Sequence, residues 1–265
     1  MIDSLGPVPR TLVVPLWARA SETQRARSIL TDWNAVTTAG SLDFDFSGLR
    51  LSRTTIIGAC ARTEAIDGMV RSCSRLDPRL LLINIGEGLD NRFGRVDNGL
   101  MACLDLDMPD VIRIRSDLVQ ESVRRRFIAK DVLDPSWINE VRNGFTTVLL
   151  VAEGVLMYLQ PDEVRTLLAR IAARFPGAQI IFDTFTPSVA RFGARLELGR
   201  GVDASYRWGV SHARELEAWG VGYKLMERQS VFQTHRRHFI WPVRLLTRIA
   251  PATVWAHSIN RLRLG

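Results

Sequence analysis

The sequence predicts an α/β protein with a doubly wound, mostly parallel sheet. From about Leu80 onward, short apolar stretches alternate with amphipathic ones, the pattern of strands joined by crossover helices. Gly86 and Gly88 directly follow the first apolar stretch, where open α/β folds bind ligands at the carboxyl edge of the sheet. No repeat, linker or low-complexity segment divides the 265 residues, so we expect one domain with additions.

The expected strands are short runs rich in β-branched and other apolar residues. Five belong to the alternating region, and two more follow near the C-terminus. In chain order they are LLINI (81–85), MACLDLD (101–107), RFIAKDV (126–132), TTVLLVAEG (146–154), QIIFDTF (179–185), YKLMERQSVF (223–232) and HSINRLRLG (257–265).

The expected helices carry apolar residues at helical spacing. The clearest spans 162–175, between Pro161 and the Pro-Gly pair at 176–177. A second covers 134–144, with Asp134 as a cap before Pro135. Further helices are expected at 15–33, at 53–73 and around 241–250, and the crossover helix after the glycines is confined to 89–96.

These elements divide the chain into four parts of one domain. We expect an N-terminal helical region at 1–78 and a cofactor-binding core at 79–186. A segment rich in Arg, Gly and aromatic residues, 187–221, interrupts the strand pattern and is expected to form a cap inserted after strand five. Residues 222–265 complete the sheet.

The bulk composition predicts neither a membrane nor a nucleic-acid partner. No apolar run approaches the ~20 residues of a membrane helix, and MIDSLGPVPR does not resemble a signal peptide, so we expect a cytoplasmic protein. The net charge of +7 suggests an acidic partner. However, only Lys130 and Lys224 are lysines, and the arginines are distributed along the chain, as a G+C-rich genome also produces. The three cysteines have no metal-ligand spacing, so we expect reduced core thiols and no metal site.

The glycines predict a nucleoside ligand without a phosphate. Asp107 ends the second strand about 20 residues after the glycines, where an acid can bind ribose hydroxyls. The dinucleotide fingerprint would place a third glycine where Asn91 stands, and no Walker lysine follows. S-adenosylmethionine is a ligand of the required kind.

Eight motifs in order over nearly the whole chain carry a family resemblance. The chain resembles the leucine carboxyl methyltransferase family, and within it the bacterial tetracenomycin-type polyketide O-methyltransferases. The resemblance implies a seven-stranded Rossmann-like methyltransferase sheet and S-adenosyl-L-methionine as the cofactor. The motifs are TLVVPLWARASET, CARTEAID, NIGEGLDNRFGRVDNG, LDLDMPDVI, VLDPSW, VAEGVLMYL, FPGAQIIFDTFTP and RWGVSHARELEAW.

The resemblance assigns cofactor contacts to the carboxyl ends of the first three strands. Gly86 and Gly88 would let the backbone close on the methionine part, and Asp107 would accept the ribose hydroxyls. Asp131 would face the adenine amino group, with Val132 packing on the ring. Asp107 and Asp131 have another interpretation, as acids that end a strand or cap a helix.

The resemblance also places charged residues around the methionine part of the cofactor. Glu153 would lie near the amino group and the sulfonium, Arg62 would bind the carboxylate, and Arg19 would assist. A solvated loop acid and a helix salt bridge are the alternatives for Glu153 and Arg62. Two residues depart from the family pattern, which has a small residue or cysteine at Glu87 and threonine at Asn91, and this leaves cofactor affinity open.

The acceptor is expected to be a small polyketide-like or aromatic molecule methylated on a carboxylate or a hydroxyl. A carboxylate needs no general base, whereas a hydroxyl benefits from one, and we assign no catalytic base. Aromatic residues of the expected cap, with Phe192 and Trp219 among them, either line the pocket or pack the cap to the sheet. The candidate substrate contacts are Tyr158, Phe185, Tyr206, Trp208 and His212.

Two other functions remain open from the sequence. A cofactor-binding homologue without transfer activity would explain Glu87 and Asn91. A nucleic-acid methyltransferase would explain the charge, but no base-reading motif or aromatic-basic stripe supports it.

Overall fold

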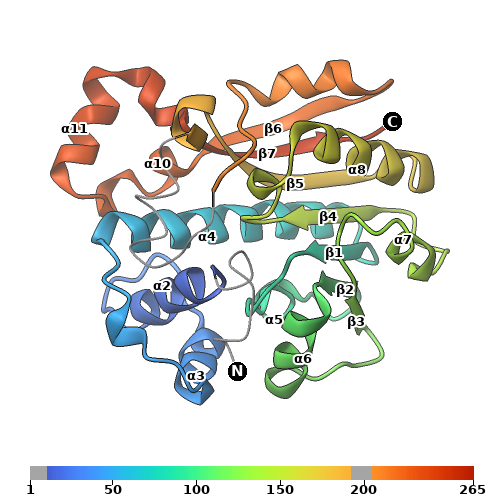
Figure 1. Cartoon of the computed structure of the whole chain (residues 1–265), viewed down its shortest axis with the longest axis horizontal. Coiled ribbons are helices and arrows are strands. Elements are labelled where there is room, and N and C mark those ends of the chain that lie inside the picture. The colour runs from blue at the N-terminus through green and yellow to red at the C-terminus, as the bar shows by residue number, and fades with distance from the viewer. Residues whose placement is uncertain (1–10, 192–204) are drawn as a thin grey trace.

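A computed structural model describes residues 11–191 and 205–265, which form a seven-stranded sheet with helices on both faces (Figure 1). The strand order is β3-β2-β1-β4-β5-β7-β6. β7 pairs antiparallel with β5 and β6, and the other pairs are parallel. The strands are β1 Leu81–Ile85, β2 Ala102–Asp107, β3 Arg125–Ala129, β4 Val148–Ala152, β5 Gln179–Phe185, β6 Lys224–Ser230 and β7 His257–Arg263. The α/β class and the mostly parallel seven-stranded sheet are therefore confirmed.

Helices cover the sheet in two layers. The α-helices are α2 Val13–Thr23, α3 Trp33–Ser41, α4 Arg53–Leu76, α5 Arg92–Val96, α6 Pro109–Leu118, α7 Trp137–Glu140, α8 Pro161–Arg174, α10 Val231–Thr234 and α11 Trp241–Ile249. The 3-10 helices are η2 Phe46–Gly48, η3 Leu156–Tyr158, η4 Ala213–Trp219, η5 Arg236–His238 and η6 Pro251–Ala256. None of the described helices is long and apolar enough to cross a membrane.

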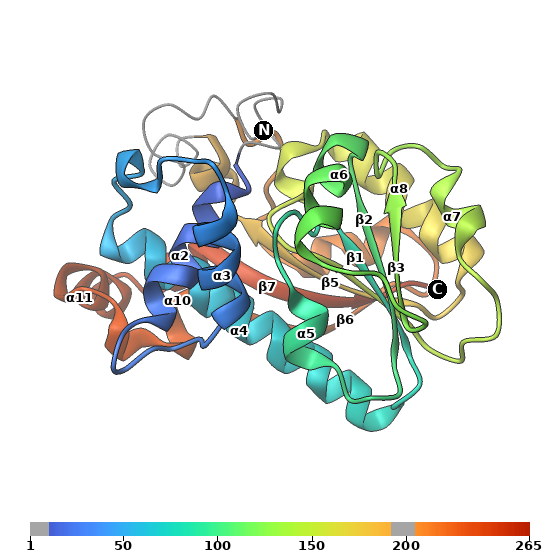
Figure 2. The same ribbon diagram turned by 90° about the horizontal axis from the view of Figure 1, so that it is seen from below.

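Alternation along the strands sends side chains into two cores. Ile83 and Leu150 pack with α7 and α8 on one face, whereas Leu82 and Leu149 pack with α4 and α5 on the other. Both faces of the central strands are thus buried, which explains their continuous apolar sequence. A third core joins α2 and α3 to α6, and α2 also packs against α4 (Figure 2).

Two predicted helices have different boundaries in the structure. The helix expected at 15–33 ends at Thr23, and α3 begins only at Trp33 because Asp32 caps it by accepting a hydrogen bond from Ala35 N at 3.0 Å. The helix expected at 134–144 is reduced to α7. Asp134 does not cap it, since its carboxylate accepts from Ser136 N and Ser136 is itself the N-terminal boundary residue.

The segment expected to form a cap lies partly outside the described residues. Its part 192–204, with Phe192, is not described. The following residues extend from Ser205 into η4, and Trp208 and Leu216 join the core cluster that contains α8. This part therefore packs on a face of the sheet, and the division of the chain into four parts stays a prediction.

Candidate cofactor and acceptor site

A cavity of about 610 Å³ opens at the carboxyl edge of the parallel strands, within the size range of small-molecule sites. Its walls come from the ends of β1, β2, β3 and β4, from α2 and α4, and from residues 205–207. All eight predicted cofactor contacts line it: Arg19, Arg62, Gly86, Gly88, Asp107, Asp131, Val132 and Glu153. Residues far apart in sequence thus meet in one hollow, although their individual roles stay predictions.

The turn after β1 has a backbone conformation that favours glycine at two positions. Gly86 and Gly88 have φ of 63° and 58°, in the left-handed region that favours glycine. A Cβ at Gly86 would lie 2.5 Å from Val155 Cγ2, so a side chain there would collide with the loop after β4. The backbone of this turn can therefore form the cavity wall directly.

Asp107 is held at the end of β2 by two backbone amides. Gly88 N and Met108 N each donate to one of its carboxylate oxygens, both at 2.7 Å. Burial raises the pKa of Asp107, and the two N–H donors act against this shift. Each oxygen keeps acceptor capacity for a hydroxyl in the cavity, because a carboxylate offers about four acceptor positions.

The loop after β3 contributes Asp131 and Val132. Leu133 N donates to the Asp131 carboxylate at 2.9 Å, so the acid closes a local turn. Lys130 beside it binds Glu140 and Ser136, both at 2.6 Å, which ties the loop to α7. Trp137 Nε1 donates to the carbonyl of Val132 and is fully buried, so the position of Val132 is set by the core.

Glu153 follows β4 and is bound by donors from two helices. Its carboxylate accepts from Arg62 at 2.9 Å, from Thr63 at 2.7 Å, and from Arg92. Burial would raise the pKa of Glu153, but Arg62 and Arg92 hold it below its ordinary value. Arg62 lines the cavity, as its predicted cofactor role requires, and it also forms the ion pair that was the alternative interpretation.

Arg62 also binds Asp183 on β5, which closes a second set of contacts. Asp183 accepts from Arg62 at 3.2 Å, from His257 Nε2 at 2.9 Å and from Gly154 N at 2.7 Å. Although burial acts in the opposite direction, Arg62 and the His257 hydrogen bond lower the pKa of Asp183 to about 2. This fixes the loop after β4 against β5 and β7.

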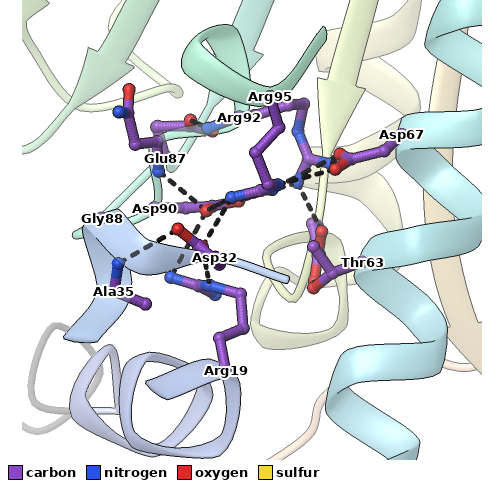
Figure 3. A network of polar contacts seen from close by, with 12 residues as sticks. Arg19, Asp32, Ala35, Thr63, Asp67, Glu87, Gly88, Asp90, Arg92 and Arg95 are labelled. Atoms are coloured by element: carbon purple, nitrogen blue, oxygen red, sulfur yellow. Dashed lines mark hydrogen bonds and ion pairs between the residues drawn. The ribbon is translucent and has the colours of Figure 1, made fainter. Parts of the chain in front are cut away.

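A buried network of charges joins the glycine turn to the N-terminal helices (Figure 3). Arg95 binds Asp32 at 2.8 Å, Asp67 at 2.7 Å and both oxygens of Asp90. Arg19 adds contacts to Asp32 at 3.0 Å and to Asp90 at 3.3 Å. Burial alone would raise the pKa of Asp90, but Arg19 and Arg95 hold it well below the usual range. These contacts join Arg19 of α2 to the turn, and Arg19 also lines the cavity, so its assistance in cofactor binding stays a prediction.

The two departures from the family pattern are tied into a second buried cluster. Glu87 accepts a hydrogen bond from Arg92 N, at the start of α5, at 3.0 Å and lies 3.7 Å from Arg115. Asn91 accepts from Arg125 Nη1 at 2.6 Å. Arg115 and Arg125 bind Asp105, at 2.9 and 2.8 Å respectively. These contacts tie Glu87 to α5 and Asn91 to β3, and Glu87 also lines the cavity.

Arg115 braces the cavity turn from below. It is 1 % exposed and donates to the carbonyls of Gly88, at 2.8 Å, and of Asp90. Its role was not predicted, because a single arginine on an amphipathic helix has no local signature. Asp105, in the LDLD motif, was the available signal, since a buried acid in a strand requires a partner.

The predicted acceptor contacts divide into two groups. Tyr158 and Tyr206 line the cavity, with ring centroids 5.4 Å apart in an edge-to-face pair. Phe185 lies behind them, stacked on Tyr206 at 5.0 Å. Trp208 packs between Phe182 and Trp219, away from the wall.

His212 lies outside the cavity, in a separate surface hollow with Arg214 and Arg228. Its Nδ1 accepts from Arg214 N and so begins η4. Burial and the charges of Arg228 and Arg214 lower its pKa. None of the four histidines, all within the described ranges, contributes to the cavity wall. Sequence reasoning missed Met108, Val155, Met157 and Arg207, which do line it.

Comparison with known proteins decides the family. Residues 13–172 match the model of the leucine carboxyl methyltransferases. The chain belongs to this family. The predictions of a methyltransferase and of S-adenosyl-L-methionine as its cofactor are thereby confirmed at the level of the family.

Curated relatives agree over most of the chain. The tetracenomycin polyketide synthesis O-methyltransferase TcmP of Streptomyces glaucescens is 29% identical over 87% of this chain and 85% of its own length. An S-adenosyl-L-methionine-dependent methyltransferase, dpfgK, of Gibberella zeae is 26% identical over 99% of this chain and 95% of its own.

Solved structures support the fold alone. A DUF574 family protein of Streptomyces avermitilis superposes with a TM-score of 0.55 at 14% identity, over 94% of this chain and 97% of the other. A SAM-dependent methyltransferase of Anabaena variabilis gives 0.53 at 11% identity, over 76% and 84%.

Proposed function

We propose that this protein is an O-methyltransferase that uses S-adenosylmethionine to methylate a carboxylate of a small aromatic acid. The observation that carries the proposal is the composition of the cavity wall. The wall carries the predicted cofactor residues together with Tyr158, Tyr206 and Arg207. The O-methyltransferase of Streptomyces glaucescens, named for polyketide synthesis, supports a small-molecule acceptor of this class.

The predicted cofactor residues fit S-adenosylmethionine, which is a methionine joined to a nucleoside. Asp107 offers oxygens for ribose hydroxyls, and the left-handed glycines bring backbone close to the ligand. Bound there, the cofactor would supply a sulfonium-activated methyl group. The task of the chain is then to hold, align and exclude water from the reacting groups.

The residues proposed to bind the acceptor, Tyr158, Tyr206 and Arg207, combine aromatic surface with a positive charge. Arg207 N donates to Met157 O at 2.7 Å, which holds the segment 205–207 against η3. The exposed guanidinium of Arg207 forms no ion pair with any of the described residues. A planar acid is expected to pack on the tyrosines while Arg207 binds its carboxylate in a bidentate way.

The absence of a histidine from the wall favours a carboxylate acceptor over a hydroxyl. A carboxylate is ionised at neutral pH and attacks without losing a proton, whereas a hydroxyl profits from a general base. Two acids of the wall, Asp90 and Glu153, are bound by arginines and have lowered pKa values, so they are poor proton acceptors. Burial raises the pKa values of Glu87 and Asp107, but both carboxylates already accept hydrogen bonds from backbone N–H groups. The alternative of a homologue that Glu87 has inactivated is not favoured, because the Glu87 carboxylate is bound by Arg92 N.

Cofactor binding is tested first, by calorimetric titration with S-adenosylhomocysteine. Asp107→Ala is expected to lower the affinity at least ~100-fold, because it removes a charged acceptor of two hydroxyls. Asp117→Ala, an exposed acid on α6, is the matched control and is expected to bind normally. Absence of binding to the unaltered protein contradicts the proposal.

The acceptor is tested by turnover with paired aromatic acids and phenols. A carboxylate acceptor gives a methyl ester that mild alkali hydrolyses, whereas a phenol gives a stable ether. Arg207→Leu is expected to raise KM for the acid by about tenfold or more, as the loss of a charge-assisted hydrogen bond predicts. Arg165→Leu on α8 is the control. An alkali-stable product would favour the hydroxyl acceptor instead.

A further inference from the structure

The positive charge of the chain is concentrated at its C-terminal end. The whole chain has 35 basic and 28 acidic residues. Residues 228–265 contain seven arginines and no acid, so residues 1–227 hold 28 of each and are neutral overall. The net charge of +7 thus equals the seven arginines of this stretch, and such asymmetry within a chain suggests an anionic partner. Three of the seven lie on β6 and β7, and the other four, Arg236, Arg237, Arg244 and Arg248, lie in η5 and α11.

The same stretch contains α11, a helix whose apolar face is open to solvent. Trp241, Leu245 and Ile249 are spaced by four residues and share one face of the helix. Trp241 is 72% exposed and Ile249 71%. Val243, on the opposite side, is partly buried against the core below the helix. The helix therefore turns its larger apolar side chains outward.

Arginines border this apolar face. Arg244 and Arg248 are exposed on α11 beside the row of apolar residues, and Arg237 is exposed in η5 just before it. Arg236 donates to the carbonyl of Arg244 and lies at the same end. Figures 1 and 2 both show α11 at one end of the molecule, at the opposite extreme from α7. The face is thus exposed and bordered by positive charge.

We propose that α11 docks the protein on the surface of an anionic lipid bilayer. A helix with Trp, Leu and Ile on one face and arginines along its border lies in the interfacial region, with the apolar residues among the acyl chains and the arginines at the phosphates. A nucleic acid would use the charge but would leave Trp241, Leu245 and Ile249 in water. Pairing with a second copy about a two-fold axis would bring this basic face against an identical basic face.

The sequence predicted no membrane partner, on the ground that no apolar run is long enough to cross a bilayer, and the present proposal departs from that prediction. A nine-residue helix is too short to cross a bilayer, but it needs no such length to lie along the surface. An aromatic acceptor of low solubility would be met at the same surface. The docking proposal does not depend on the acceptor, however, because the helix lies outside the cavity wall.

The test is co-sedimentation of the full chain with vesicles of equal parts phosphatidylglycerol and phosphatidylcholine. The protein is expected to sediment with these vesicles and to remain in solution with phosphatidylcholine alone, because the arginines require anionic headgroups. Raising the salt concentration is expected to weaken the binding, since it screens the charges.

Two double variants, each with a control, distinguish binding through this surface from nonspecific adsorption to the vesicles. Trp241→Ser with Ile249→Ser is expected to lower partitioning about tenfold or more, from the lost burial of two large side chains. Trp33→Ser, at a tryptophan of α3 that is 63% exposed, is expected to leave the partitioning unchanged.

The charges are tested separately. Arg244→Gln with Arg248→Gln is expected to lower partitioning about tenfold at low salt. Arg113→Gln with Arg165→Gln, exposed positions on α6 and α8, is the charge control. The proposal is overturned by a protein that stays in solution with anionic vesicles, by equal losses in the controls, or by a dimer that the Trp241 substitution dissociates.

Discussion

Replacing Arg115 by methionine tests whether the buried brace holds the cofactor turn in place. The substitution keeps the volume and the helix propensity of the position but removes every polar contact of the guanidinium. Lost are the hydrogen bonds to the carbonyls of Gly88 and Asp90, the 2.9 Å pair with Asp105 and the longer contact to Glu87.

The expected cost follows from the burial of the partners. Asp105 is completely buried and would keep Arg125 as its charged partner at 2.8 Å, so it would not be left wholly uncompensated. Removing one member of a buried ion pair costs about 3–5 kcal/mol, and two carbonyls lose donors in addition. We therefore expect the free energy of unfolding to fall by about 3–5 kcal/mol, a large part of the stability of a typical domain.

Urea denaturation followed by circular dichroism measures this difference. Arg113→Met is the matched control, because Arg113 lies two residues earlier on the same helix and is exposed. It is expected to change the stability by less than about 0.5 kcal/mol. A loss of less than about 1 kcal/mol for Arg115→Met would refute the brace, since the lost contacts then carry no net energy.

Where Arg115→Met fails to fold, Arg115→Lys supplies the answer. Lysine keeps the charge for Asp105 but cannot serve two carbonyls and a carboxylate with the geometry of a guanidinium. This variant is expected to fold and to bind S-adenosylhomocysteine about tenfold more weakly, because the carbonyls of the turn are no longer fixed. Unchanged affinity would show that the turn keeps its shape without the brace.

Three further predictions concern the cavity and its charges. Burial, with Asp90 and Asp105 nearby, raises the pKa of Glu87 from 4.5 to about 8. The free energy of unfolding of the wild type is therefore expected to fall as the pH rises between those values. Glu87→Gln is expected to make this free energy depend less on pH, as urea titrations at several pH values would show. Asp183→Asn is expected to cost about 2 kcal/mol at neutral pH and less than about 0.5 kcal/mol at pH 2, because the low pKa of Asp183 contributes stability that is mostly lost as the pH falls from 3.8 to about 2. Gly86→Ala is expected to abolish cofactor binding through its collision with Val155, whereas Gly99→Ala, also at positive φ but with open space around it, is expected to lose only about 1 kcal/mol of stability and to bind normally.

The sheet and the glycine turn were predictable because their signals are local. The strand QIIFDTF was predicted with the observed bounds of β5, since a run of apolar residues between a Pro-Gly turn and another break has few other solutions. Gly86, Gly88 and Asp107 follow strands directly, so their place at the sheet edge follows from the topology. Helix boundaries at 24–32 and 134–136 were not predictable, because Asp32 and Ser136 compete with other polar residues for the capping position.

The side-chain partners were not predictable because they depend on distant contacts. Arg115 and Gly88 are 27 residues apart, and Arg62 and Asp183 are 121 apart. Trp208 illustrates the same difficulty. An aromatic residue near a site has the same sequence signature whether it faces the ligand or packs on the sheet, and here it lies 4 % exposed against Phe182.

The charges of this protein have different uses in its two halves. Around the turn, arginines and acids are buried in nearly balanced clusters, and their mutual contacts fix the backbone that forms the cavity wall. This balance explains how Glu87 can stand where the family pattern has a small residue, since Arg92 N and Arg115 receive it. At α11, Arg244 and Arg248 are exposed and form no ion pair with any residue in the described part of the chain, so their charge is available to a partner. A high net charge read from composition alone does not distinguish arginines that are buried against acids from exposed arginines such as those of α11.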